Sequence, residues 1–236
     1  MHILNVHDVK VPVKNGDISP VIWQALESGS YEAKEAKRIA AVVKPNDRVL
    51  ELGSGLSVIT TLISRIEGVK VWAVEANPAT FALGHRVLEA NGVNNVSLTQ
   101  GLLTSGPASE HIFYIRKDLW MSSIDQDQGP YEQTITLSSS NIDEFITAHA
   151  INVLFMDIEG AERDLLVGAE LPGIQRIFIE LHDHLYGLEG IRRITQALTL
   201  RGFAYDPRAS FGSCVLFAQN DGPREYQSEA SNENFK

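Results

Sequence analysis

The chain has 236 residues, of which 44% are hydrophobic and 21% are charged, as in an ordinary folded globular protein. Its formal net charge of −10 argues against general binding to nucleic acid, which requires a basic surface. The sequence has neither an apolar stretch near the roughly 18 residues of a membrane span nor an N-terminal signal segment, which predicts a cytoplasmic protein without a membrane span.

Residues 1–45 are expected to form an N-terminal arm and helices that pack on the core. Residues 3–13 are interpreted as an edge strand or an arm. A short helix is predicted from Pro20, because proline suits the first helical position, and it ends at Gly29. A second helix is predicted over 31–43, where apolar residues recur at helical spacing.

Strand-like and helical segments alternate over residues 46–219, which are expected to form one α/β domain. The alternation predicts a doubly wound, mostly parallel seven-stranded sheet, because parallel strands need helical crossovers. The last two strands are joined by a short loop, which predicts an antiparallel C-terminal hairpin. The polar tail 220–236 is expected to be disordered. The predicted strands are 48–52, 69–74, 96–99, 151–156, 176–181, 202–205 and 214–218, and the predicted helices are 58–66, 77–91, 141–149, 162–168 and 188–201.

The pattern is weaker between the third and fourth of these strands. Residues 112–115 and 132–137 are interpreted as strands, and the polar stretch 122–133 as a loop. That loop and the helical segment near Tyr31 are candidates for a cover over a ligand site, because closing a cover excludes water. Trp120 either lines a substrate pocket beneath the cover or belongs to the core.

A glycine-rich turn, Gly53-Ser54-Gly55, follows the first strand of the α/β domain. Glycine lets the backbone turn tightly and approach a ligand, and the helix that follows presents free N–H groups. Glu51 stands just before the turn. Glu75 ends the next strand, where a carboxylate can accept hydrogen bonds from both hydroxyls of a ribose. We therefore predict a nucleotide cofactor on this turn.

Three further residues complete the predicted cofactor site. Ala76 directly follows Glu75. Gln100 and Gly101 stand at the end of the third strand, where the adenine of the cofactor is expected. Gln100 either bonds the adenine edge or is a solvated loop residue.

Two classes of cofactor compete for this architecture. The dinucleotide fingerprint G-x-G-x-x-G requires glycine at the position of Val58. Glu51 would repel a pyrophosphate, whereas it would attract the ammonium and sulfonium groups of S-adenosylmethionine. We therefore predict S-adenosylmethionine, with an NAD-linked oxidoreductase and a non-catalytic nucleotide-binding domain as the alternatives.

The segment Met156-Asp157-Ile158-Glu159-Gly160-Ala161-Glu162 is an apolar strand running into Asp-x-Glu-Gly-x-Glu. In this segment the chain resembles the FkbM-type family of class I S-adenosylmethionine-dependent methyltransferases. The resemblance implies a Rossmann-like fold and O-methylation of a hydroxyl on a sugar or small natural product, a small-molecule acceptor. Further matches at 29–32, 74–78, 122–123, 179–182 and 202–203 extend the resemblance over residues 29–218.

The chain departs from this family in the first motif. The family usually has aspartate and a third glycine where this sequence has Glu51 and Ser57. Serine is small enough to let the following helix pack closely on the strand. We interpret the motif as a variant of the same cofactor site.

Asp157 and His182 are the predicted catalytic residues. Asp157 ends the fourth strand, where ligands of open α/β sheets bind, and His182 has an unperturbed pKa of about 6.5 that suits a general base. The alternatives are a helix-capping aspartate and a structural histidine; His184 is a weaker candidate. Together with Glu180, these two residues alternatively bind a divalent cation. The single cysteine, Cys214, is expected to be a small core side chain.

Overall fold

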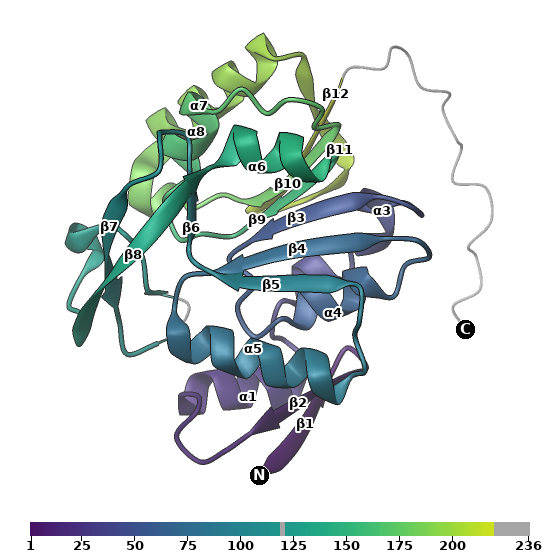
Figure 1. Ribbon diagram of the computed structural model, residues 1–236, viewed down its shortest axis with the longest axis vertical. Coiled ribbons are helices and arrows are strands. Elements are labelled where there is room, and N and C mark those ends of the chain that lie inside the picture. Colours follow the sequence, from purple (N-terminus) through teal and green to yellow (C-terminus); the bar gives the residue numbers. More distant parts are fainter. Residues whose placement is uncertain (119–120, 220–236) are drawn as a thin grey trace.

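The computed structural model describes residues 1–118 and 121–219. At its centre is a seven-stranded sheet of order β11-β12-β10-β9-β3-β4-β5 (Figure 1). The five strands from β10 to β5 are parallel, and β12 and β11 run antiparallel as the C-terminal hairpin. The predicted Rossmann-like fold is confirmed. Its strands are β3 (Arg48–Leu52), β4 (Lys70–Glu75), β5 (Val96–Gln100), β9 (Val153–Met156), β10 (Arg176–Glu180), β11 (Phe203–Phe211) and β12 (Cys214–Gln219).

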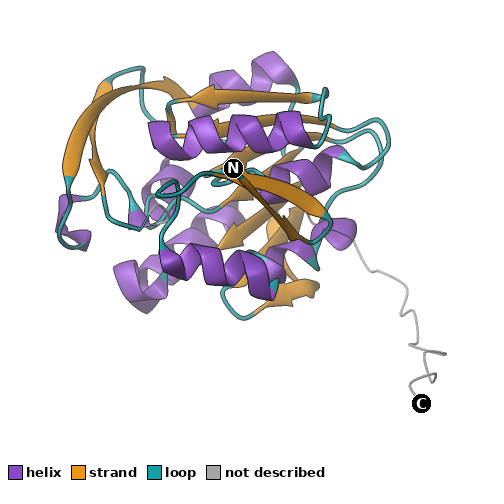
Figure 2. Ribbon diagram, turned by 90° about the horizontal axis from the view of Figure 1, so that it is seen from below, coloured by secondary structure: helices purple, strands orange, loops and turns teal. Residues whose placement is uncertain are grey.

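Successive residues of each central strand enter two different hydrophobic cores. Val49 packs with the helices on one face of the sheet, and Leu50 packs with those on the other. Strands buried on both faces are nearly continuous apolar runs, which is why the parallel sheet could be predicted. Figure 2 shows helices on both sides of the sheet. One layer holds α3 (Ile39–Val42), α4 (Val58–Ser64) and α5 (Pro78–Ala90), and the other holds α6 (Ile142–His149), α7 (Glu162–Gly168) and α8 (Asp183–Leu200).

Of the two alternatives for residues 3–13, an edge strand and an arm, the edge strand is wrong. The segment forms a separate antiparallel hairpin, β1 (His2–Val6) and β2 (Val9–Val13), outside the main sheet. The hairpin packs against α5 and against α1 (Pro20–Ser28), which begins at the predicted proline. The chain reverses tightly between β1 and β2 at His7 and Asp8, which both have positive φ.

Two predicted helices have different bounds. The single helix expected over 31–43 is two short ones, α2 (Ala33–Ala36) and α3. The apolar spacing over 31–43 does not correspond to one buried helix face. α2 buries no residue, whereas α3 buries Ile39 and Val42 against the sheet. The last helix, predicted from about residue 188, is preceded by a helical turn from Asp183, and the non-helical Gly187 separates the two parts.

A small three-stranded sheet is inserted between β5 and α6. Its order is β6-β8-β7, and the two predicted strand-like runs lie in β7 and β8. The connection between β7 and β8 folds back toward the main sheet and includes a short 3-10 helix, η2 (Gln126–Gln128). Trp120 and the tail 220–236 lie outside the described residues. The strands are β6 (Leu102–Thr104), β7 (Glu110–Ile115) and β8 (Gln133–Asn141).

Among the helices of the described ranges, none has both the length and the apolar character needed to cross a membrane.

Candidate active site

The glycine-rich turn lies between the carboxyl ends of β4 and β9. Gly53 has a φ of +79°, and a Cβ on it would lie 1.7 Å from the carbonyl oxygen of Asp157. The N–H groups of Gly53 and Ser54 both donate to the carbonyl of Val74, at 2.9 and 3.3 Å. Only glycine can therefore occupy position 53 without moving the backbone that carries Asp157.

Ser57, which replaces the third glycine of the motif, is fully buried at the start of α4. Its φ is +58°, a conformation that glycine adopts more readily than serine. Its hydroxyl faces Gly84 of α5, where a Cβ would lie 2.6 Å from Ser57 Oγ. The absence of a side chain at Gly84 thus leaves room for the Ser57 side chain in the turn.

Gly84→Ala is expected to lower the free energy of unfolding by about 1–3 kcal/mol, because crowding against Ser57 outweighs the gain in helix propensity. The double variant Ser57→Gly/Gly84→Ala should recover most of this loss, since Ser57 Oγ is gone and only the carbonyl of Gly55, 3.3 Å from the new Cβ, stays close. Urea denaturation of the original protein, both single variants and the double variant measures this coupling. A double variant as unstable as Gly84→Ala would contradict the proposed contact.

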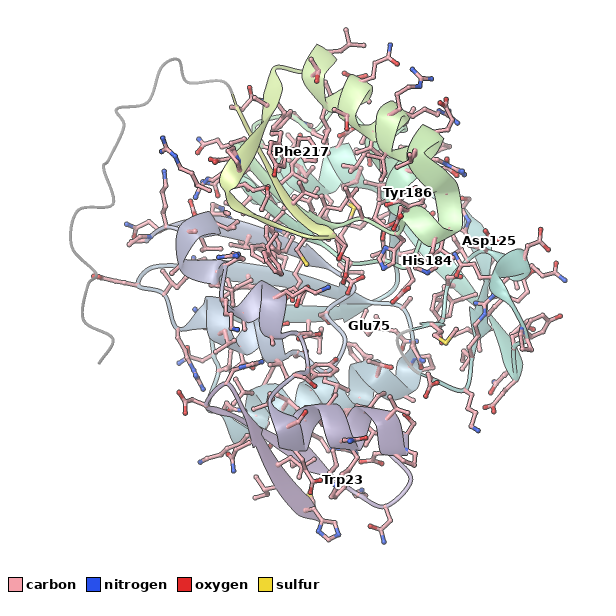
Figure 3. All side chains as sticks on the ribbon, turned by 180° about the vertical axis from the view of Figure 1, so that it is seen from behind. Trp23, Glu75, Asp125, His184, Tyr186 and Phe217 are labelled. Atoms are coloured by element: carbon pink, nitrogen blue, oxygen red, sulfur yellow. The ribbon has the colours of Figure 1, made fainter. Side chains whose placement is uncertain are left out.

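Glu75 connects the glycine turn to the start of α5. Its Oε2 accepts a hydrogen bond from the N–H of Gly55 at 2.9 Å, and its Oε1 accepts one from the N–H of Asn77 at 2.8 Å. The side chain is buried, and this burial raises the pKa of Glu75 to about 7 despite these bonds. In Figure 3, Glu75 lies near the centre of the molecule.

Two more carboxylates flank the turn: Glu51 is buried behind it, and half-buried Glu32 lies beside Gly55. Glu51 shares its strand face with Val49, and burial raises its pKa to about 8. Burial and the charges of Glu51 and Glu35 raise the pKa of Glu32 well above its usual value. Within the part of the chain described, Oε2 of Glu51 and Oε2 of Glu32 are buried without a hydrogen-bond partner. Buried acceptors of this kind favour a positively charged ligand.

A cavity of about 1000 Å³, open solvent at its mouth included, lies at the carboxyl ends of β3, β4 and β9. Of the predicted cofactor residues, Gly53, Gly55, Glu75, Ala76 and Gly101 line it. The predicted residues that do not line it are Glu51 and Ser54, which are buried, and Gln100, which is exposed. The remaining lining residues are Ile22, Tyr31, Glu32, Leu52, Leu56, Val74, Thr80, Leu102, Leu103, Thr104, Phe113, Ser122, Ser123, Ile124, Asp157, Ile158, Glu159 and Ala161.

The segment that follows β7 lies over this cavity, as predicted for a cover. Its residues Ser122, Ser123 and Ile124 line the cavity. Buried Arg116 organises the segment. Its guanidinium donates hydrogen bonds to Ser123 Oγ and to the carbonyls of Met121 and Asp125. Gln128 Nε2 donates to the carbonyl of Glu159 at 2.7 Å, which joins the cover to the loop after β9.

The Asp-x-Glu-Gly-x-Glu loop and the start of α8 together place one histidine among several carboxylates. His182 Nε2 lies 3.5 Å from Asp157 Oδ1 and 3.4 Å from Glu159 Oε2, and His182 Nδ1 lies 3.0 Å from Glu162 Oε1. Glu162 also accepts hydrogen bonds from the N–H groups of Ile158 and Gly160. The loop is strained at Glu159, whose φ is +51°.

The carboxylates change the titration of this histidine. Burial lowers the pKa of His182, but Glu162, Asp157 and Glu159 outweigh it and raise the pKa to about 9. Burial and the charges of Glu159 and Glu180 raise the pKa of Asp157 well above its usual value. The surrounding carboxylates therefore favour the protonated form of His182. His184 is exposed, with its ring edge-on to that of His182.

Comparison with known proteins identifies the family to which the chain belongs. Residues 53–205 match the model of the family described as the methyltransferase FkbM domain, which is more than half of the chain. The chain belongs to the FkbM methyltransferase family. Its methyl donor is S-adenosylmethionine. A comparison with curated protein sequences gives no match.

Solved structures share the fold of this FkbM methyltransferase. TYW2 from M. jannaschii in complex with AdoMet has 13% sequence identity and a TM-score of 0.51, over 92% of this chain and 84% of that chain. A SAM dependent methyltransferase from Aquifex aeolicus has 12% identity and a TM-score of 0.47, over 85% of this chain and 97% of that chain. At this identity the first likeness supports the fold alone.

Two residues of this FkbM methyltransferase site were not predicted as site residues. Glu32 lines the cavity beside Gly55, and the sequence signal for it was the match at 29–32. Glu162 was interpreted as a residue of the first helical turn, and it does begin α7. Its contact with His182 joins positions 20 residues apart, so no local pattern indicates it.

Proposed function

We propose that this FkbM methyltransferase transfers the methyl group of S-adenosylmethionine to a hydroxyl of a sugar or small natural product. The observation that carries the proposal is the position of Asp157, which lines the cavity at the end of β9 with His182 directly behind it. A carboxylate at that edge of the sheet lies where the acceptor must meet the methyl group. The family resemblance supplies the acceptor class.

The cofactor fits the polar groups around the glycine turn. Glu32 lines the cavity and has a buried carboxylate oxygen without a hydrogen-bond partner in the described chain, which suits the positive charges of S-adenosylmethionine. Glu51, behind the turn, does not line the cavity. Glu75 has both oxygens engaged by single N–H groups, and a carboxylate oxygen accepts more than one hydrogen bond. Glu75 can therefore also receive the ribose hydroxyls. Gly101 and the residues after it lie where the adenine is expected.

The bound cofactor supplies an activated methyl group and its leaving group, so the chain has to orient the acceptor and take its proton. Asp157 is placed to orient the acceptor hydroxyl and to accept its proton as the carbon–oxygen bond forms. Ser122 on the cover has its hydroxyl proton free for a polyhydroxylated acceptor, since its Oγ accepts a hydrogen bond from the N–H of Arg116. The cover itself excludes water, which would otherwise compete for the acceptor position.

The proposal is tested by incubating the purified chain with methyl-labelled S-adenosylmethionine and a panel of acceptors. The panel contains monosaccharides, glycosides, polyhydroxylated natural products, and matched amines. We expect label on a hydroxyl oxygen of a sugar or natural product. Label on amines alone would contradict the acceptor class, and thermal stabilisation by NAD but not by S-adenosylhomocysteine would contradict the cofactor.

The affinity for S-adenosylhomocysteine is expected to rise about 10-fold between pH 6 and pH 8. The pKa of Glu75 in the free protein is about 7, and ribose hydroxyls bond its ionised form more strongly, so protons compete with the ligand below that pH. Calorimetric titration of the original protein and of Glu75→Gln at several pH values measures the effect.

Glu75→Gln should bind S-adenosylhomocysteine about 10-fold or more weakly at pH 8, with a shallower pH dependence below pH 7. Glu89→Gln, an exposed change on the same helix α5, is the matched control and should retain the full pH dependence. Unchanged affinity in Glu75→Gln would contradict the ribose assignment.

A further inference from the structure

His182 is held so that one ring nitrogen is turned toward carboxylates at the cavity. Its side chain is only 8% exposed, and Nδ1 lies 3.0 Å from Oε1 of fully buried Glu162. Glu162 is fixed in turn by the N–H groups of Ile158 and Gly160, at 3.0 and 2.9 Å. Glu162 thus faces Nδ1, and Nε2 is the ring nitrogen that can exchange its proton for a metal ion.

Nε2 is too far from the two carboxylates it faces, Asp157 and Glu159, to form a short hydrogen bond with either. Asp157 Oδ1 and Glu159 Oε2 lie 3.5 and 3.4 Å from Nε2, whereas a charge-assisted hydrogen bond is about 2.7–2.9 Å long. Asp157 Oδ1 is buried and has no hydrogen-bond partner among the described residues. One ligand atom each from Asp157, Glu180 and His182 lies within 4.8 Å of the others.

We propose that Asp157, Glu180 and His182 bind a divalent cation of the Mg²⁺ or Mn²⁺ class beside the cofactor cavity. Two carboxylates with one imidazole suit hard to borderline divalent ions. Glu162 contacts Nδ1 of the same ring, as carboxylates that orient a metal-binding histidine commonly do. The excess of carboxylates over cations in this partly buried cluster gives a doubly charged ion a favourable field.

The role of the ion rests on the proposed function. Asp157 reaches the cavity, so an ion on Asp157 lies where the acceptor hydroxyl approaches. Coordination lowers the pKa of a hydroxyl, as it does for water, and fixes its oxygen in line with the methyl group. The carbon–sulfur bond then breaks as the carbon–oxygen bond forms, and the hydroxyl proton passes to Glu159, which also lines the cavity. Asp157 acts in this case as a ligand rather than as the base.

A second group in the described chain has metal-binding residue types and shares Glu180. It consists of Glu35, Glu180 and Cys214. Cys214 Sγ donates a hydrogen bond to Glu35 Oε1 at 2.8 Å, and burial raises the pKa of the thiol, so the cysteine stays protonated. Lys34 Nζ lies 3.9 Å from Glu180 and places a positive charge beside this group. We therefore assign the ion to the histidine side of Glu180.

Mn²⁺ binding tests the site directly, with the full chain loaded with S-adenosylhomocysteine. Titration followed by electron paramagnetic resonance should give one Mn²⁺ site, and its pulsed spectrum should contain the modulation of a coordinated imidazole nitrogen. The Kd for Mn²⁺ should rise about 10-fold or more in His182→Gln and in Asp157→Asn. It should change little in Glu35→Gln and in Asp164→Asn, which removes an exposed carboxylate on α7.

Each outcome separates the cation site from the proposed function. A wild-type chain that binds S-adenosylhomocysteine but shows no Mn²⁺ site, or shows one without nitrogen modulation, overturns the inference and leaves the methyltransferase proposal standing. A loss of Mn²⁺ in Glu35→Gln equal to that in His182→Gln also overturns it, because the ion would then belong to the other group. A Mn²⁺ site with nitrogen modulation in a chain that methylates no hydroxyl supports the site and refutes its role. If a variant does not fold, the nitrogen signal of the wild-type chain decides.

Discussion

Asp47→Asn is expected to lower the free energy of unfolding by about 3–5 kcal/mol, because it leaves a buried guanidinium without its counter-charge. Arg176 donates to both oxygens of Asp47, at 2.8 and 3.0 Å, and to the carbonyl of Val42 at 2.7 Å. Asn152 also donates to Asp47, at 2.8 Å. Asp47, Asn152 and Arg176 precede or begin β3, β9 and β10, so this network holds together the end of the sheet opposite the cavity.

Urea denaturation followed by circular dichroism measures the loss. Glu189→Gln is the matched control, because it breaks an exposed ion pair. The side chains of Arg192 and Glu189 are 61% and 66% exposed. Solvent screens that pair, so the control should leave the midpoint unchanged within error. A similar midpoint in Asp47→Asn and Glu189→Gln would show that Arg176 finds another partner or reaches solvent.

The sequence carried most of the fold because the central strands are apolar on both faces. Val49 and Leu50 face opposite layers, and such a run between helical segments has few alternatives to a buried parallel strand. The N-terminal region lacked this constraint. Its segment 3–13 alternates apolar and polar residues, which fits an edge strand as well as the hairpin that the structure contains. Only packing on α5 distinguishes the two.

The same contrast applies to the site. Gly53 and Glu75 follow strands whose carboxyl ends must meet at one edge of a parallel sheet, so their positions at the cavity could be predicted. The direction of a side chain is harder to predict. Glu51 precedes the turn in sequence but points behind it, toward the α4 layer, because it shares the strand face of Val49. The contact between His182 and Glu162 depends on how α8 packs beside α7, which local sequence does not encode.

Asp157→Asn is expected to lower kcat by about 100-fold or more, on the best acceptor that the panel identifies, with little change in the affinity for S-adenosylhomocysteine. Asparagine keeps the shape of the side chain and removes its charge. The main chain of Asp157, which packs against Gly53 and donates to the carbonyl of Leu52 at 3.0 Å, is unaffected by the substitution. The cofactor side of the cavity should therefore be preserved while the acceptor loses its carboxylate.

Stopped-time assays with labelled cofactor give kcat, and calorimetry gives the affinity for S-adenosylhomocysteine. Asp164→Asn is the matched control, since it makes the same chemical change seven positions later on an exposed side chain. Wild-type turnover in Asp157→Asn would refute a catalytic role for this residue, whether as base or as metal ligand. A parallel loss of cofactor affinity would instead place Asp157 in cofactor binding. The two measurements together thus separate loss of acceptor chemistry from a displaced Asp157 loop, because that loop packs against Gly53 and cannot move without changing the cofactor site.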